Sequence, residues 1–119
     1  MKTDNQVLID SKAFALRIIK LYKYLIEDKC VYVLSKQVLR SGTSIGANVR
    51  ESVNAQSRMD FINKLNVALK EANETEYWLE LLYESGYLKE DEFKSIYNDC
   101  GKIAATLTKI IKTTKSVQL

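Results

Sequence analysis

A row of basic residues at helical spacing is the feature of the sequence that best fits binding chemistry. Lys36, Arg40 and Arg50 fall on one side of a helix over this segment, and Arg58 follows just beyond it. Arginines in a row can contact successive phosphates of a nucleic acid. The alternative is an ordinary solvated helix face, which is what most charged stripes are. These four residues are therefore the candidate nucleic-acid contacts of the sequence.

The other side of the same segment is small and polar. Ser41, Ser44 and Asn48 lie there among aliphatic residues. Buried hydroxyls and amides need hydrogen-bond partners. Serine can bond to a carbonyl of its own helix, and we expect Asn48 to find a partner near the start of the next helix. All three are predicted to be structural residues that fix the register between helices, rather than binding residues.

Carboxylates and thiols are the remaining candidates for chemistry. Metal sites in helical bundles usually need Glu-x-x-His pairs, and the sequence contains no histidine. The same absence excludes Ser-His-Asp catalysis and leaves Cys30 and Cys100 without an activating base. We expect no enzyme activity, no catalytic residue, no metal and no cofactor, and an all-carboxylate metal site is the minor alternative. The carboxylates in question are Glu71, Glu74, Glu76, Glu80 and Glu84.

Composition narrows the class of protein. The chain has 119 residues, 46% of them hydrophobic, with 18 basic and 15 acidic side chains and a net charge of +3. This length predicts a single domain over residues 1–119. Residues 1–58 carry ten basic and five acidic groups, whereas residues 59–119 carry eight and ten. No apolar run approaches the ~20 residues of a membrane helix, and the first ten residues, MKTDNQVLID, lack the apolar region typical of a signal peptide. We expect a cytoplasmic protein with no membrane partner.

The elements that position these residues are helices. Apolar residues recur every three or four positions, which predicts helices over 11–27, 31–55, 58–85 and 90–114. Short connections between them require antiparallel neighbours. The predicted fold is all-α, an antiparallel up-down-up-down four-helix bundle. Ser57 with Asp60 should cap the third helix, and Gly86 should end it.

Small residues predict how the second and third helices meet. Folding the chain about Ser57 places Gly46 opposite Ala68 and Gly42 opposite Ala72. Each glycine costs about 1 kcal/mol against alanine inside a helix. We expect a close approach of these two helices as the compensation.

Apolar residues outside the core stripe predict self-association. Val67, Trp78 and Leu81 lie well off the face of the third helix that carries its core residues. An exposed tryptophan with aliphatic neighbours indicates a subunit interface. A wide core stripe that buries the tryptophan is the alternative.

Two motifs resemble a known family. The run SKQVLRSGTSIGANVRES (residues 35–52) is followed by SRMDFINKLNVALKEANETEYWLELL (57–82) and GYL (86–88). Over about residues 12–112 the chain resembles the bacterial four helix bundle family, also called the 23S rRNA-intervening sequence protein family. It is also similar to the accessory variability protein of diversity-generating retroelements. Members are often encoded inside insertions in 23S ribosomal RNA genes.

The resemblance implies an antiparallel bundle, a homopentamer and no catalytic residues. It also implies a basic surface that engages RNA or DNA, and a nucleic-acid-handling partner such as a reverse transcriptase. The predicted function is therefore a non-enzymatic oligomeric bundle that binds nucleic acid or such a partner through a basic helix face. A protein–protein scaffold with no nucleic-acid role is the alternative.

Overall fold

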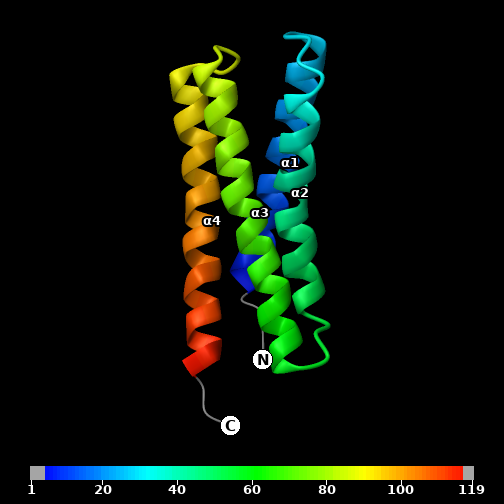
Figure 1. Ribbon diagram of the computed structural model, residues 1–119, viewed down its shortest axis with the longest axis vertical. Coiled ribbons are helices and arrows are strands. Elements are labelled where there is room, and N and C mark those ends of the chain that lie inside the picture. The colour runs from blue at the N-terminus through cyan, green and yellow to red at the C-terminus, as the bar shows by residue number, and fades with distance from the viewer. Residues whose placement is uncertain (1–4, 117–119) are drawn as a thin grey trace.

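The computed structural model describes residues 5–116 and folds them into four helices (Figure 1). They are α1 (Asn5–Glu27), α2 (Leu34–Ser52), α3 (Arg58–Glu84) and α4 (Glu90–Ser116). Each helix runs antiparallel to the next, which confirms the predicted all-α, up-down-up-down bundle. The expected bounds of α3 and α4 are right to within two residues. α1 begins six residues earlier than expected, and α2 is three residues shorter at each end.

The bundle is a rod of 52 × 21 × 19 Å. α2 packs against both α1 and α3, α3 packs against α4, and the contact between α1 and α4 is the sparsest of these four. Arg17 of α1 bridges this thinner seam. Its guanidinium reaches Asp99 Oδ2 (Nη1, 2.6 Å) and Ser95 Oγ (Nη2, 2.7 Å) on α4.

The start of α3 is capped as the sequence predicts. Ser57 Oγ accepts a hydrogen bond from the backbone N–H of Asp60 at 3.0 Å. The Asp60 carboxylate accepts in return from the N–H of Gln56, at 3.1 Å. The return bond therefore reaches one residue further back than in a standard capping box.

Two helices are followed by a turn in which one residue takes a left-handed backbone conformation. Gly86 does so after α3 (φ 88°), as expected, because glycine has no Cβ to clash. Cys30 does so after α1 (φ 56°), where nothing in its residue type indicates it. The closing bonds are Tyr87 N–H to Leu82 O and Val31 N–H to Leu25 O, both 2.9 Å. This turn separates α1 from α2 and explains why residues 31–33 are not helical.

The glycines of α2 face α1, so the expected close approach of α2 and α3 at these positions is wrong. A Cβ built on Gly42 would lie 2.7 Å from Ile18 Cγ1, and one on Gly46 would lie 3.2 Å from the backbone oxygen of Ser11. Ile18 and Ser11 both belong to α1 and are buried. The lengthwise register of α2 on α3 is nevertheless as expected. The pairs that show it are Ser41 with Thr75, Arg40 with Glu71, and Glu51 with Lys64.

Replacing Gly42 should destabilise the bundle. Gly42→Ala forces a methyl group against Ile18, a fully buried β-branched side chain with little freedom to move. Overpacking of this kind costs about 1–3 kcal/mol, which exceeds the roughly 1 kcal/mol that alanine gains in helix propensity. Urea unfolding at one fixed protein concentration measures the difference.

Gly101→Ala is the matched control. Its added Cβ would meet only Glu76 Oε2, at 3.8 Å, which is ordinary contact. This variant should gain about 0.5–1 kcal/mol from helix propensity. Equal stability of the two variants would contradict the close packing of α1 on α2.

Candidate nucleic-acid and subunit interfaces

Arg40 and Trp78 meet at one carboxylate on the α2–α3 face. The Arg40 guanidinium binds Glu71 Oε2 (Nη1, 3.1 Å) and also Glu74 Oε1 through Nη2. The indole N–H of Trp78 donates to the same Glu74 oxygen at 3.2 Å. The sequence assigns Arg40 to nucleic acid and Trp78 to a subunit interface. In the structure they share one network, and two glutamates already offset the charge of Arg40.

A buried hydroxyl pair lies beside this network. Thr75 Oγ1 of α3 lies 2.9 Å from Ser41 Oγ of α2 and 2.7 Å from the carbonyl oxygen of Glu71. Both hydroxyl-bearing residues are completely buried. Thr75 is absent from the sequence predictions. Its signal is a small polar residue at a core position of α3, opposite Ser41 in the register.

The other polar residues of α2 bond within their own helix. Ser44 Oγ donates to the carbonyl oxygen of Arg40 at 2.6 Å, and Asn48 Nδ2 donates to that of Ser44 at 2.9 Å. The expectation that Asn48 would bond near the start of α3 is therefore wrong. The side-chain amide of Asn48 instead donates to the backbone carbonyl four residues earlier in its own helix.

The remaining predicted basic residues are spread over the molecule. Lys36 and Arg50 are exposed on α2. Arg58 is half-buried at the start of α3, and its Nε donates to the carbonyl oxygen of Thr114 at 3.1 Å. A guanidinium at the last turn of α4 complements the helix dipole. Arg58 therefore joins the end of α4 to the start of α3, away from the stripe of α2.

The antiparallel fold separates charge along the rod. One half holds residues 5–15, 43–70 and 102–116, where Figure 1 shows the ends of α2 and α4 beside the starts of α1 and α3. It contains nine basic and three acidic residues, a net charge of +6. The other half, residues 16–42 and 71–101, contains eight basic and eleven acidic residues, a net charge of −3. The four basic residues of α4 in the first half are all exposed: Lys102, Lys109, Lys112 and Lys115.

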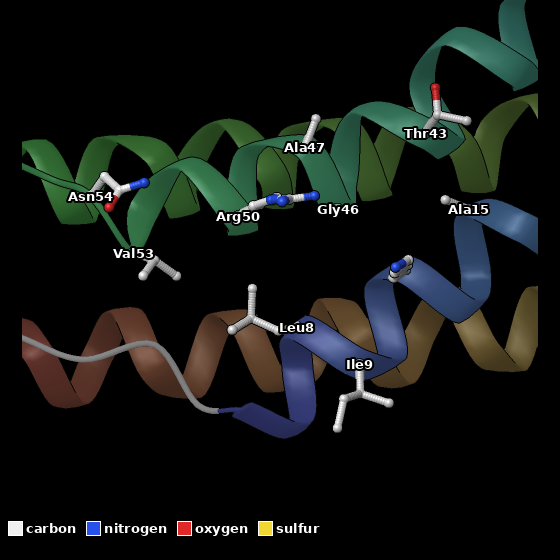
Figure 2. Close-up of a pocket in the computed structure, with 10 residues that line it drawn as sticks. Leu8, Ile9, Ala15, Thr43, Gly46, Ala47, Arg50, Val53 and Asn54 are labelled. Atoms are coloured by element: carbon white, nitrogen blue, oxygen red, sulfur yellow. The ribbon is translucent and has the colours of Figure 1, made fainter.

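A groove of about 720 Å³ runs between α1 and α2 in the basic half (Figure 2). Leu8, Ala15 and Val53 provide apolar lining, and Lys12 and Arg50 are its charged lining residues. Figure 2 shows Arg50 lying between α2 and α1. No acidic residue belongs to the described lining of this groove. The sequence predictions do not include it, because it depends on how closely two helices cross.

The predicted interface residues of α3 lie at its surface to different extents. Val67 is 44% exposed, and Tyr77, ten residues further along α3, is 54% exposed. Trp78 and Leu81 are half-buried, and Trp78 packs against the core. The ring centroids of Tyr77 and Trp78 lie 5.3 Å apart. The indole is thus less exposed than expected, and the exposed apolar area comes from Val67 and Tyr77.

The model of a protein family described as 23S rRNA-intervening sequence protein matches residues 3–109. The chain belongs to this family. A crystal structure at 1.70 Å of a protein of unknown function, from the S23 ribosomal protein family of Bacteroides thetaiotaomicron, is similar to it. The two share 58% sequence identity and a TM-score of 0.91 over 92% of this chain and 98% of the other. Among curated proteins, none matches the chain.

Titratable groups gather between α3 and α4 of this chain. Glu80 Oε2 accepts a hydrogen bond from Tyr97 at 2.7 Å, which raises the pKa of that phenol to about 12. Burial, followed by the charges of Glu76 and Asp99, raises the pKa of the Cys100 thiol to about 12. Burial and the neighbouring Glu80 raise the pKa of Glu76. The Cys100 thiol is therefore protonated and unreactive at neutral pH.

The part of the chain that the structure describes contains neither a candidate metal site nor a candidate membrane span. Within residues 5–116, no three histidine, cysteine, aspartate or glutamate side chains are grouped so as to hold a metal ion. None of the helices described there combines the length and the apolar character that crossing a membrane requires.

Removing the charge of Glu76 should stabilise the protein at neutral pH. A carboxyl whose pKa is raised in the folded state favours folding at low pH and loses that contribution as pH rises through the raised pKa. Glu76→Gln should therefore be more stable than the wild type at pH 7, by less than about 1 kcal/mol because the side chain is partly exposed. Thermal unfolding measured between pH 4 and pH 7 tests this.

The control is Glu84→Gln, which neutralises an exposed glutamate of the same helix. It should change stability little across the same range. A stability advantage of Glu76→Gln over the wild type that grew as pH fell would have the wrong sign and would contradict a raised pKa of Glu76.

Proposed function

We propose that this protein is a non-enzymatic, homo-oligomeric nucleic-acid-binding protein of the cytoplasm. The separation of charge along the rod supports this proposal. A net charge of +6 over the described residues of one half is much larger than the +3 of the whole chain. A concentrated basic surface attracts a polyanion far more strongly than the same charge spread evenly. The family description points to RNA as the polyanion.

The lysines of α4 are the main contact surface in this proposal. Lys102 and Lys115 are 13 residues apart, so the row extends over about 20 Å at 1.5 Å per residue. Lysines of this kind neutralise phosphates and release counterions without reading bases. Contact is therefore expected with the nucleic-acid backbone, independent of sequence.

The stripe of α2 is the weaker candidate surface. Arg40 is held by two glutamates, and Arg58 binds the end of α4. Lys36 and Arg50 are exposed and keep their candidate role in phosphate contact. The family resemblance adds a nucleic-acid-handling protein, such as a reverse transcriptase, as a partner.

Binding should depend on the α4 lysines and on salt. Lys109→Ala/Lys112→Ala should weaken binding to a 20-base-pair RNA duplex and lower the slope of log K against log salt by about two, one for each lysine. Fluorescence anisotropy between 50 and 300 mM salt, a range chosen around the regime in which phosphate contacts dominate, measures both quantities.

The matched control is Lys20→Ala/Lys23→Ala, which removes two exposed lysines from the acidic half of the rod. This variant should bind nearly as well as the wild type. If Arg40→Ala/Arg50→Ala lost binding while the α4 variant kept it, the contact surface would lie on α2 instead. No binding by the wild type at low salt would reject the function.

Self-association is the second part of the proposal, and the exposed apolar residues favour it. Tyr77 lies exposed on α3 beside the half-buried Trp78 and Leu81, and Val67 is exposed on the same helix ten residues before Tyr77. The family resemblance predicts five copies. A scaffold without nucleic-acid binding is the alternative that this surface also fits.

Light scattering tests the assembly. The wild type should show a mass several times 13.6 kDa, and Val67→Asp should reduce it toward the single-chain value by placing a charge in the apolar contact. Val33→Asp changes a residue that is 75% exposed outside α3 and should leave the mass unchanged. A wild type that stays at 13.6 kDa at high concentration would rule out self-association.

A further inference from the structure

The lysine-bearing part of α4 offers a nucleic acid a narrow range of chemistry. From residue 102 to residue 116, lysine is the only charged residue type, and the segment contains no arginine, asparagine, glutamine or aromatic residue. Arginine, asparagine and glutamine can each read a base edge through two hydrogen bonds. The side chains of this segment are therefore suited to phosphates rather than to bases.

The threonine hydroxyls beside these lysines are directed at their own helix. Thr106 Oγ1 donates to the carbonyl oxygen of Lys102 at 3.0 Å, and Thr108 Oγ1 donates to that of Ala104 at 2.9 Å. Thr114 Oγ1 bonds the carbonyl oxygen four residues earlier in the same way, at 2.8 Å. These three hydroxyl protons are already used within α4, so they are not available to a base edge.

The basic half also lacks a surface on which unpaired bases could stack. Phe14 and Phe61 are the aromatic residues of its described segments, and they are 2% and 1% exposed. Tyr32 and Tyr77, which are more than half exposed, belong to the other half of the rod. Proteins that hold single strands combine a basic groove with aromatic side chains on which successive bases stack. At the α4 lysines an unpaired base finds no such partner.

Charge itself favours two paired strands over one. Double-stranded DNA carries one phosphate for every ~1.7 Å of its axis, twice the density of either strand alone. Over the roughly 20 Å from Lys102 to Lys115, a duplex of this kind presents about twelve phosphates, whereas one strand presents about six. Each neutralised phosphate also releases more counterions from a duplex than from a single strand. A surface that acts by charge alone therefore binds the duplex more tightly.

We propose that the α4 lysines bind a nucleic-acid duplex in preference to single strands. This inference rests on the proposed function and specifies its ligand, which is two paired strands contacted at their phosphates. A duplex is stiff over this length, as is the helix that carries the lysines, so the two rows of charge stay aligned. RNA and DNA duplexes share this chemistry, and the 2′-hydroxyl is the group by which a protein tells them apart.

Competition between paired and unpaired strands measures the preference. A labelled 20-base-pair RNA duplex is bound to the wild type and displaced by unlabelled RNA duplex, by a DNA duplex of the same sequence, or by oligouridine or oligothymidine. The unpaired strands are about 40 nucleotides long, so they carry about as many phosphates as a duplex. At about 0.1 M salt, a duplex should compete about fivefold or more better than the unpaired strand of the same sugar, because four lysines release fewer counterions from a single strand. The duplex that competes better identifies the sugar.

A tyrosine placed among the lysines tests the role of stacking. Ala105 is exposed on α4, three residues after Lys102 and four before Lys109, so it lies on the same part of the helix surface. Ala105→Tyr should tighten oligouridine binding by about fivefold or more, the contribution of one stacked base, and should not tighten duplex binding. Ser85→Tyr is the matched control. Ser85 is exposed in the turn between α3 and α4, which lies at the end of the rod opposite the last turn of α4 (Figure 1), and this variant should change neither affinity.

The possible results separate this inference from the proposed function. Unpaired strands that compete as well as the duplex of the same sugar would overturn the inference and leave nucleic-acid binding intact. An oligouridine affinity that Ala105→Tyr leaves unchanged would also overturn it, and so would a duplex affinity that Lys109→Ala/Lys112→Ala leaves unchanged. Failure of the wild type to bind any of these nucleic acids at low salt would overturn the proposed function, and this inference with it.

Discussion

The bundle depends on the close contact of α1 with α2 at Gly42 and Gly46, two residues that have no side chain. At Gly42 the side chain of Ile18 occupies the space that a Cβ would need, and at Gly46 the backbone of Ser11 lies almost as close. Two glycines four residues apart weaken a helix. The fully buried Ile18 is part of the core that offsets this cost. α1 is thereby held close along α2, and the groove opens beside the crossing at Gly46.

The other side of α2 is organised by hydrogen bonds rather than by close backbones. Ser41 and Thr75 form a buried hydroxyl pair between α2 and α3, and Arg40 spans the same two helices with its ion pairs to Glu71 and Glu74. A sliding movement of one helix along the other would break all of these contacts together. Buried polar pairs of this kind specify register, which a smooth apolar interface does less strictly. Arg40, whose residue type suggests a binding site, therefore helps to hold α2 against α3.

The sequence was sufficient for the helices, their antiparallel order and the cap at Ser57, because periodicity and capping are local properties. It was insufficient for the partner of the α2 glycines. Folding about Ser57 predicts which residues lie at the same height, but it does not predict whether a residue faces α1 or α3. The early start of α1 has a visible signal, since Val7 lies seven residues before Phe14 on the same buried face. The end of α1 has none, because cysteine at residue 30 adopts a backbone conformation usual for glycine.

The candidate site was likewise predictable only in part from the sequence. The basic and apolar residue types were evident from the sequence, and Val67 is exposed as expected. The pairing of Arg40 with two glutamates was not evident, because it needs the packed α2–α3 face. The groove was beyond sequence reasoning, since it depends on the distance between two helix axes. The concentration of charge in one half follows from counting charges on antiparallel helices, so that signal was present in the sequence.

A rod 52 Å long with cations toward one end and anions toward the other has a large permanent electric dipole along its axis. In the field of a polyanion such a molecule turns before it touches, so its basic end leads the approach. Retention on a cation-exchange resin would accordingly exceed what a net charge of +3 suggests. In a cyclic assembly every copy has the same orientation relative to the ring axis, and the dipole components along that axis add. The two rims of such a ring would then be electrically unlike, and only one of them would attract phosphate.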